Sequence, residues 1–328
     1  MMTTTLVRPK TKTQKLAGKR TDKDLVILGG GPAGLTAAIY SARAQLNILL
    51  VEKMILGGMV STTSQIENYP GFPKGISGLD LSANMEQQAR HHGVETVWGN
   101  ASNIKQKKGH FEITIDEKII TTKAVIIASG TEAAKLGIPG EERFRGRGVS
   151  YCATCDGAFY KDKNVMVIGG GNSAIEEAIF LTRYAKKVSV VHRRDQLRAD
   201  KIVAERAKAN PKIYFFWHCV VEEICGKQMV EEVVLSDLQG EKKLRVPIDG
   251  VFIYVGSNPN SDIVKDLAKL DDNGFIKTDE EMATSTPGIF AAGDIRVKTL
   301  RQVVTAAADG AIAAESARRF IEENIDKK

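Results

Sequence analysis

Two cysteines separated by two residues are the clearest reactive feature of the chain. They are Cys152 and Cys155 in the stretch SYCATCDGAF, and the carboxyl group of Asp156 follows directly. Such a C-x-x-C pair can be half of a zinc site, a redox-active disulfide or two buried thiols. Zinc would need further ligands, and the other two cysteines, Cys219 and Cys225, have a spacing that is poor for a zinc finger. We therefore expect no metal, and we interpret Cys219 and Cys225 as small buried apolar residues.

A dinucleotide-binding motif lies near the start of the chain. The apolar run Leu25–Leu28 predicts a buried strand, residues 35–44 predict a helix, and residues 47–51 predict a second strand that leads to Glu52. The first strand and the helix are joined by G-x-G-x-x-G, whose glycines let the backbone approach a pyrophosphate. Glu52 is placed to accept hydrogen bonds from a ribose. The residues of the turn that we expect at the nucleotide are Gly29, Gly31, Pro32, Ala33 and Gly34.

A second copy of this motif follows the cysteine pair. It has the form G-x-G-x-x-A and lies between strands that we expect over residues 165–168 and 188–191. At the position of Glu52 the second copy has a histidine, and arginines follow it. Removing the carboxylate and adding guanidinium groups suits a ribose that carries a 2′-phosphate, so this site is predicted to bind NADPH. The residues that carry this prediction are Gly169, Gly171, Ala174, His192, Arg193, Arg194 and Arg198.

The order of the predicted elements repeats after each motif, which indicates an internal duplication. A helix over residues 301–323 has no counterpart in the second copy, and we expect it to return to the first domain. The predicted fold is α/β, with two Rossmann-like, three-layer ββα domains, the second inserted into the first. The predicted segments are a basic, disordered tail (1–24), a discontinuous first domain (25–131 and 262–328) and an inserted domain (132–261).

Charge and composition restrict the classes of partner. The chain has 328 residues, 43% of them hydrophobic and 26% charged, and a formal net charge of +6. That charge belongs to residues 1–20, and residues 21–328 carry equal numbers of basic and acidic side chains. The composition therefore favours neither a nucleic-acid partner nor a membrane. We expect a cytoplasmic protein, with an organelle transit peptide as the alternative interpretation of the tail.

The order of these motifs resembles that of low-molecular-weight thioredoxin reductases. Besides the two glycine turns, the resemblance rests on IENYPG (66–71), ASG (128–130), CATCDG (152–157), the pattern HRRxxxR and AAGD…RQ, and it extends from about Leu25 to the end of the chain. It implies FAD at the first site and NADPH at the second. The FAD contacts that it implies, besides the first turn and Glu52, are Gly58, Asn68, Gly130, Asp294, Arg301 and Gln302. At the NADPH site it adds Asn172 and Ser173.

The resemblance also implies a mechanism and a partner. Hydride passes from NADPH to FAD, the electrons then pass to the Cys152–Cys155 disulfide, and the dithiol reduces thioredoxin. In this scheme Cys155 lies next to the flavin, Cys152 attacks the partner, and Asp156 is the acid/base. The inserted domain carries both the disulfide and the NADPH site, so it must rotate during turnover.

The resemblance allows a second function and also implies an oligomeric state. The alternative function is a related disulfide reductase that serves a glutaredoxin-like or peroxiredoxin partner. A homodimer is the family expectation. One departure from the family is Met59, which stands where glutamine is common and removes a polar contact expected at the flavin edge.

Overall fold

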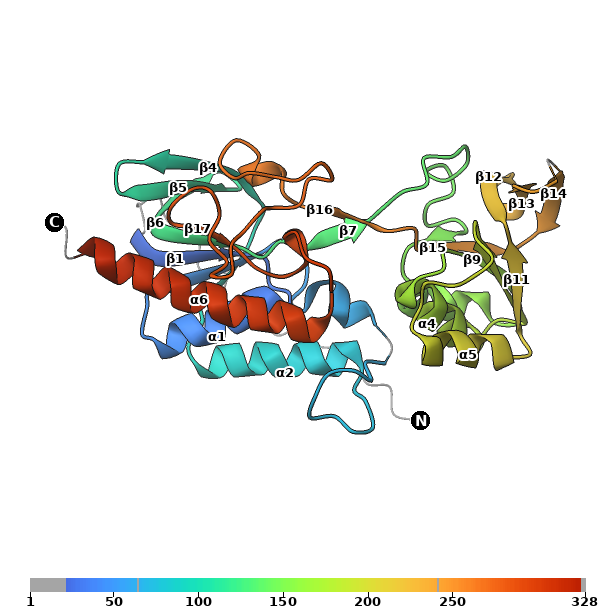
Figure 1. Cartoon of the computed structure of the whole chain (residues 1–328), viewed down its shortest axis with the longest axis horizontal. Helices are drawn as coiled ribbons and strands as arrows, with labels where there is room; N and C mark the ends of the chain where they lie inside the picture. Colours follow the sequence, from blue (N-terminus) through green and yellow to red (C-terminus); the bar gives the residue numbers. More distant parts are fainter. Residues whose placement is uncertain (1–21, 64, 241, 326–328) are drawn as a thin grey trace.

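The chain folds into two α/β units that lie side by side and are joined by two strands that cross between them (Figure 1). The computed structural model describes residues 22–63, 65–240 and 242–325. Of the predicted basic tail, residues 1–21 lie outside the described residues. The last residues of that segment, from Asp22 onward, instead belong to the first strand. This strand begins before Leu25 because Asp22 and Lys23 pair with Thr121 and Thr122 of the neighbouring strand. The buried Lys23 ammonium is also paired with Glu95 at 2.5 Å.

The first domain is built on a seven-stranded sheet in the order β3-β2-β1-β6-β5-β4, with β17 paired to β6. Helices α1, α2 and α6 cover one face of it (Figure 1). Its strands are β1 (Asp22–Leu28), β2 (Ile48–Glu52), β3 (Thr96–Trp98), β4 (Ala101–Lys107), β5 (His110–Ile115), β6 (Lys118–Ile127) and β17 (Ile289–Ala291). Its helices are α1 (Pro32–Arg43), η1 (Gly58–Thr62), α2 (Gly78–His91), η3 (Asp262–Val264), η4 (Gly293–Ile295) and α6 (Val303–Ile325).

The inserted domain repeats this plan with a five-stranded parallel sheet and a separate three-stranded antiparallel sheet. The parallel sheet has the order β11-β10-β9-β15-β8, and α4 and α5 pack together against one face of it. Its elements are β8 (Val149–Ser150), α3 (Ala153–Asp156), η2 (Gly157–Tyr160), β9 (Asn164–Ile168), α4 (Asn172–Leu181), β10 (Lys187–His192), α5 (Lys201–Ala209), β11 (Ile213–Trp217) and β15 (Gly250–Ile253). The antiparallel sheet consists of β12 (Cys219–Gly226), β13 (Val230–Asp237) and β14 (Lys243–Pro247).

The central strands are apolar on both faces because each sheet separates two cores. In β1, Leu25 and Ile27 face the helices, whereas Val26 and Leu28 pack on the opposite side with β4, β5 and residues near 264–276. In β9, Val165 and Val167 pack toward α4, whereas Met166 and Ile168 face the antiparallel sheet. A continuous apolar run is the expected pattern of a parallel strand that is covered on both sides. The duplication that the sequence predicts is therefore visible in the packing, and the α/β class is confirmed.

The chain crosses between the domains twice, and the two crossings pair with each other. They are β7 (Thr131–Ala133) and β16 (Ser257–Pro259), which run antiparallel. Asn260 strengthens this pairing, because its backbone N–H donates to the Gly130 carbonyl at 3.0 Å and its side-chain amide donates to the Ser129 carbonyl at 2.9 Å. After the second crossing the chain returns to the first sheet through β17, as an insertion requires.

The two cysteines outside the C-x-x-C pair do not share one environment. Cys219 is buried, as expected, but Cys225 is only half-buried, so the prediction for Cys225 was wrong. The reason is a register shift in β12 between Val221 and Glu223, which turns Ile224 rather than Cys225 toward the core.

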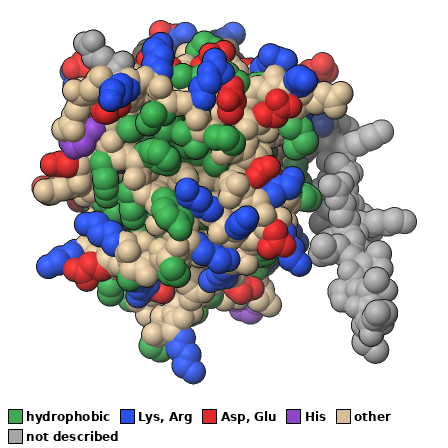
Figure 2. Space-filling model, turned by 90° about the vertical axis from the view of Figure 1, so that its right-hand side faces the viewer, with side chains coloured by type: hydrophobic (Ala, Val, Ile, Leu, Met, Phe, Trp, Pro, Cys, Tyr) green, Lys and Arg blue, Asp and Glu red, His purple; other side chains and the backbone are tan. Residues whose placement is uncertain are grey.

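The outer end of the inserted domain carries mixed charges around an apolar area (Figure 2). Lysine, arginine, aspartate and glutamate side chains are interspersed there, without a large surface of one sign. In the part of the chain that the structure describes, no helix has the length and apolar character needed to cross a bilayer.

Candidate redox and dinucleotide sites

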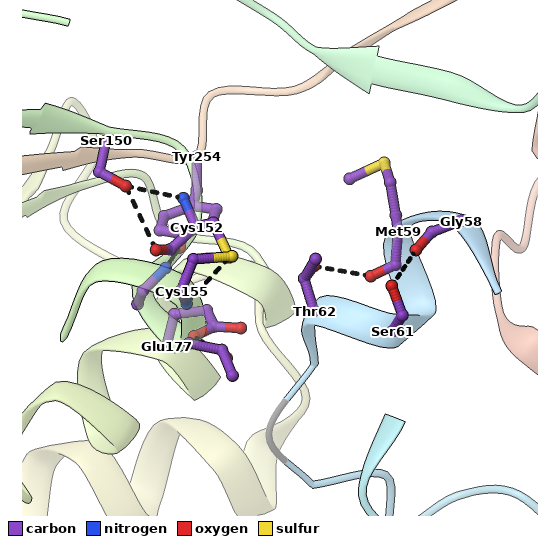
Figure 3. The surroundings of a disulfide bond; sticks show 11 residues. Gly58, Met59, Ser61, Thr62, Ser150, Cys152, Cys155, Glu177 and Tyr254 are labelled. Atoms are coloured by element: carbon purple, nitrogen blue, oxygen red, sulfur yellow. Dashed lines mark hydrogen bonds between the residues drawn. A yellow bond between two sulfur atoms is a disulfide. The ribbon is translucent and has the colours of Figure 1, made fainter. Parts of the chain in front are cut away.

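Cys152 and Cys155 form a disulfide at the edge of the inserted domain (Figure 3). Their Cα atoms are 5.3 Å apart, which is within the usual range for a disulfide. Cys152 precedes the short helix α3, and its Sγ accepts a hydrogen bond from the Cys155 backbone N–H at 3.1 Å. The described residues contain no group of three or more His, Cys, Asp or Glu side chains arranged to hold a metal ion. Of the three chemistries that the pair allows, the structure adopts the disulfide.

Three residues of the inserted domain hold the disulfide segment in place. The Tyr254 hydroxyl accepts a hydrogen bond from the Ala153 N–H at 2.8 Å, and the Ser150 hydroxyl accepts one from the Cys152 N–H at 3.0 Å. Thr154, between the cysteines, lies 3.5 Å from a carboxylate oxygen of Glu177. Figure 3 shows Tyr254 and Glu177 beside the cysteines and η1 of the first domain across from them.

Burial changes the acidity of both of these titratable neighbours. It raises the pKa of Glu177 to about 7, and the negative charge of Glu176 adds to the increase. It also raises the pKa of Tyr254, with a further contribution from Glu177, so that the phenol keeps its proton. The disulfide is therefore flanked by a carboxyl group that titrates near neutral pH.

The two cysteines differ in exposure. Cys155, which was expected next to the flavin, is exposed, and Cys152 is half-buried. Asp156 is also half-buried, at the end of α3. The hydrogen bonds from this segment to Ser150, Tyr254 and Glu177 stay within its own domain.

The first glycine turn is shaped as a phosphate-binding turn. A side chain at Gly34 is excluded, because its Cβ would lie 1.8 Å from the Gly29 carbonyl oxygen, whereas the space around Gly31 is open. Pro32 begins α1, so the N-terminus of this helix points at the open side of the turn. Glu52, at the end of β2, accepts hydrogen bonds from the N–H groups of Gly30 and Met54, both at 2.7 Å. These contacts fix the carboxylate beside the turn, and the residues fit an adenine dinucleotide.

The residues expected at the flavin end come from distant parts of the chain and meet near the same turn. The Asn68 amide donates to the Gln302 side chain at 3.1 Å, and a Cβ on Gly58 would lie 3.4 Å from Gly31. One carboxylate oxygen of Asp294 is buried without a hydrogen-bond partner, and burial raises the pKa of this group. An orphaned buried acceptor of this kind fits the hydroxyl groups of a bound ligand. Arg301 lies over the Phe275 ring at 4.1 Å, and α6 begins at Val303, close to the expected start.

A buried ion-pair cluster holds the AAGD turn against α6. Asp309 accepts hydrogen bonds from the Gly293 N–H at 3.0 Å, from Lys298 at 2.7 Å and from Arg296 at 3.1 Å. The Asp309 and Lys298 side chains are each only 9% exposed. The cluster therefore sets the position of the residue before Asp294.

Replacing Asp309 by alanine should lower the free energy of unfolding by about 3 kcal/mol, because two buried cations would lose their carboxylate partner. We expect weaker retention of the first-site dinucleotide as well. Urea denaturation at a fixed cofactor concentration measures the first effect, and ultrafiltration measures the second. Glu315→Ala is the matched control, since it removes an exposed ion pair from the same helix and should cost little. Equal losses in the two variants would contradict the role of the cluster.

The second glycine turn has the same form but a different partner at the end of its strand. His192 is buried, and a Cβ on Gly170 would lie 2.5 Å from its ring. Burial lowers the pKa of His192, with the charges of the nearby arginines adding to the effect. The guanidinium-bearing residues Arg193, Arg194 and Arg198 are exposed in the loop that follows β10. This loop is tied to the turn by the Arg198 N–H, which donates to the Gly170 carbonyl at 2.7 Å.

The remaining residues expected at the second site frame the start of α4. Asn172 exchanges two hydrogen bonds with Asp200, at 2.6 and 3.0 Å, which joins the starts of α4 and α5. Ser173 is exposed, and Ala174 is buried beneath the turn. The structure thus places Asn172, Ser173, Ala174, His192 and Arg198 around the start of α4, with room above Gly171.

Sequence reasoning missed Glu177, Tyr254 and Asp309. A signal for Glu177 was available, because it lies three residues after Ala174 and four before Leu181, on the buried face of α4. A carboxyl group on the apolar face of a helix is unusual and deserves a functional explanation. Tyr254 contacts Ala153, 101 residues earlier in the chain, and Asp309 contacts partners 11 to 16 residues earlier, on a different element, so no local pattern indicates either residue.

Comparisons with known proteins agree with this geometry. Residues 23–310 match the family model described as pyridine nucleotide-disulphide oxidoreductase. The chain is 48% identical to the thioredoxin reductase of Listeria monocytogenes over 302 residues, which cover 92% of this chain and 94% of the relative. It is 46% identical to that of Bacillus subtilis over 301 residues, covering 92% and 95%.

Solved structures show the same likeness in three dimensions. The Lactococcus lactis thioredoxin reductase in its FR conformation superposes with a TM-score of 0.90 at 44% identity, covering 92% of this chain and 99% of that one. The Streptococcus pyogenes thioredoxin reductase has a TM-score of 0.63 at 46% identity, covering 93% and 100%. With two dinucleotide-binding turns, an inserted domain and a C-x-x-C disulfide, the chain belongs to the low-molecular-weight thioredoxin reductases of the pyridine nucleotide-disulphide oxidoreductase family.

Proposed function

We propose that this protein uses NADPH and FAD to reduce the disulfide of thioredoxin through Cys152 and Cys155. The observation that carries the proposal is a disulfide of suitable geometry on the same domain as a glycine turn flanked by arginines. The family supports a flavin and a nicotinamide coenzyme in general, and the assignment of each to a site is our proposal. In these terms, residues 25–131 and 262–328 form the FAD domain and 132–261 the NADPH domain. We propose a cytoplasmic homodimer on the resemblance alone.

The first site supplies binding groups for FAD. When bound, FAD accepts a hydride from the nicotinamide and passes its electrons to the disulfide. The glycine turn and the start of α1 would hold the pyrophosphate, and Glu52 would accept hydrogen bonds from the adenosine ribose. The unpartnered oxygen of Asp294 would accept a ligand hydroxyl. Met59, which is 57% exposed on η1, offers a thioether where the family commonly has an amide, so it provides only a weak acceptor.

The redox segment performs the exchange with the partner protein. Reduction breaks the Sγ–Sγ bond and leaves two sulfurs, one of which attacks the partner disulfide as a thiolate. The Cys155 N–H stabilises negative charge on Cys152, which supports Cys152 as the attacking sulfur. Asp156 lies directly behind Cys155 in the chain and is our candidate for the acid/base. A glutaredoxin-like or peroxiredoxin partner remains the alternative acceptor.

The proposal includes a rotation of the inserted domain. The disulfide lies on that domain and the flavin site on the other, and only the paired crossings β7 and β16 link them covalently. Two solved relatives of nearly equal identity superpose on this chain to very different extents, as a change in domain orientation would produce. This difference supports the rotation.

A coupled assay tests the proposed function. NADPH oxidation should be slow with enzyme alone and should become fast when oxidised thioredoxin is added, with free thiols appearing in thioredoxin. Glutaredoxin-like and peroxiredoxin substrates should give little turnover. Turnover with one of these substrates, but not with thioredoxin, would mean that the alternative partner is the electron acceptor. Failure of NADPH to reduce the flavin would contradict the assignment of the second site.

Replacing Arg193 and Arg198 together by alanine should raise the KM for NADPH about 100-fold, because two cations would no longer contact the 2′-phosphate. The KM for NADH should change little, since that coenzyme lacks the phosphate. Steady-state kinetics with both coenzymes measure the two values. Lys187→Ala is the control, since it removes a cation from the opposite end of β10. An equal increase in both KM values would contradict recognition of the phosphate by these arginines.

A further inference from the structure

We propose that Glu177 shares a proton with the reduced Cys152–Cys155 pair, so that a cysteine thiolate and the Glu177 carboxylate are not both charged at neutral pH. The inference rests on the redox role of this disulfide. Its test requires neither NADPH nor a partner protein, so it can fail while the proposed function stands.

The position of Glu177 carries the inference. Helix α4 packs against α3, and Glu177 lies on the same face of α4 as the buried Ala174, Ala178 and Leu181. Its carboxylate oxygen is 3.5 Å from the hydroxyl of Thr154, which lies between the two cysteines. Figure 3 shows the Glu177 side chain directed from α4 toward the cysteine pair. The half-buried carboxyl group is therefore held beneath the sulfurs.

Among the residues that the structure describes, the surrounding elements offer this carboxylate no cation. Glu176, its neighbour on α4, opposes its ionisation, and on α3 only the Thr154 hydroxyl favours it. From the segment after β15, Tyr254 presents a phenol that stays protonated, and Asp156 on α3 adds negative charge near that phenol. On α5, which packs against α4, Arg206 is paired with Glu67. Strands β9 and β10 present valines to this helix.

Such a group is suited to exchange one proton with the sulfurs. Reduction adds two electrons to the disulfide, breaks the Sγ–Sγ bond and leaves two thiolates, which become thiols on taking up two protons. We assign one of these protons to Glu177, whose O–H bond breaks as an S–H bond forms, and the second to solvent through Asp156, the proposed acid/base. When the thiol later attacks the partner disulfide, its proton returns to the Glu177 carboxylate, and the partner's leaving sulfur departs with the electron pair. The second cysteine then loses its proton to solvent, its sulfur displaces the partner's other sulfur from the mixed disulfide, and the Cys152–Cys155 bond forms again. The partner's two thiolates take up protons from solvent, so Glu177 ends the cycle as it began.

The charge of Glu177 should control how readily the pair ionises. Two acidic groups this close titrate as a pair, and a carboxylate raises the pKa of a neighbouring thiol. In Glu177→Gln the neutral amide removes this repulsion, so the pH midpoint for thiolate formation should fall by about one unit. At a pH below that midpoint, alkylation of the reduced pair should be about tenfold faster than in the wild type.

The experiment follows iodoacetamide alkylation of the dithiothreitol-reduced holoenzyme from pH 5 to 9, after removal of the reductant. Peptide mass spectrometry reports Cys152 and Cys155 separately from Cys225. Glu176→Gln is the matched control, because it removes an exposed carboxylate from the adjacent position of α4 and should shift the midpoint less. Glu177→Asp should restore most of the wild-type profile. An unchanged or higher midpoint in Glu177→Gln, or an equal shift in Glu176→Gln, would overturn the proposal.

A second measurement covers the case in which Glu177→Gln does not fold. The infrared difference spectrum between disulfide and dithiol forms of the wild type at pH 7 should contain a band from a protonated carboxyl group that changes on reduction. Glu177→Asp should shift the frequency of this band. A difference spectrum without any carboxyl band would overturn the proposal equally.

Discussion

Replacing Cys152 by serine should lower the rate of thioredoxin reduction at least about a thousandfold while leaving reduction of the bound flavin by NADPH intact. The serine hydroxyl cannot form a disulfide with the partner, so exchange stops at the first step. Hydride transfer to the flavin uses neither sulfur and should continue. Stopped-flow absorbance measures flavin reduction, and the coupled assay with thioredoxin measures turnover in the same preparation.

Cys225→Ser is the matched control, because Cys225 is a half-buried thiol on β12 outside the redox segment and its loss should leave turnover unchanged. Retained turnover in Cys152→Ser would exclude the disulfide from the reaction.

The same series of variants decides which sulfur attacks. If Cys152 attacks, Cys155→Ser should form a mixed disulfide with thioredoxin that acid quenching preserves for detection, and Cys152→Ser should not. Because Cys155 is the exposed member of the pair in this arrangement, the reverse result would assign the attack to Cys155.

The two glycine turns could be predicted from sequence because their signals are local. In each motif a strand, a glycine turn and a helix follow one another within a short stretch, and an acidic or basic residue stands at the end of the next strand. Each of these positions accepts only certain residue types. The exclusion of a side chain at Gly34 by the Gly29 carbonyl is such a requirement. The return of the chain to the first sheet was also predictable, because the last helix had no counterpart in the second copy.

The parts that sequence could not provide depend on contacts between distant residues. Asp309 forms its cluster only after α6 has packed beside the AAGD turn, and the pairing of Asn68 with Gln302 joins segments from opposite ends of the first domain. The exposure of Cys155 is set by the packing of the folded chain, which no spacing of residues encodes. Cys225 was placed incorrectly because a bulge changes which side chains of β12 face inward.

The ion pair between Arg206 and Glu67 identifies where the two domains can be clamped. Arg206 lies on α5 of the inserted domain and Glu67 in the loop before α2 of the first domain, with 2.8 Å between the charged atoms. Both side chains are about half exposed, so this pair contributes little stability and does not prevent movement. A covalent link at the same place would prevent it.

Joining cysteines at positions 67 and 206 with a short bis-maleimide should therefore lower turnover more than about a hundredfold, because the disulfide and the NADPH site would no longer alternate at the flavin. The link is made in the Cys225→Ser background with Cys152–Cys155 oxidised, so that the added thiols react. FAD should stay bound, and its absorbance after ultrafiltration checks this. Each single-cysteine variant, treated with the same reagent, should keep its activity. Full activity in a preparation shown by mass spectrometry to be linked would mean that electrons reach the partner without rotation, and that the exposed Cys155 is already in its working position.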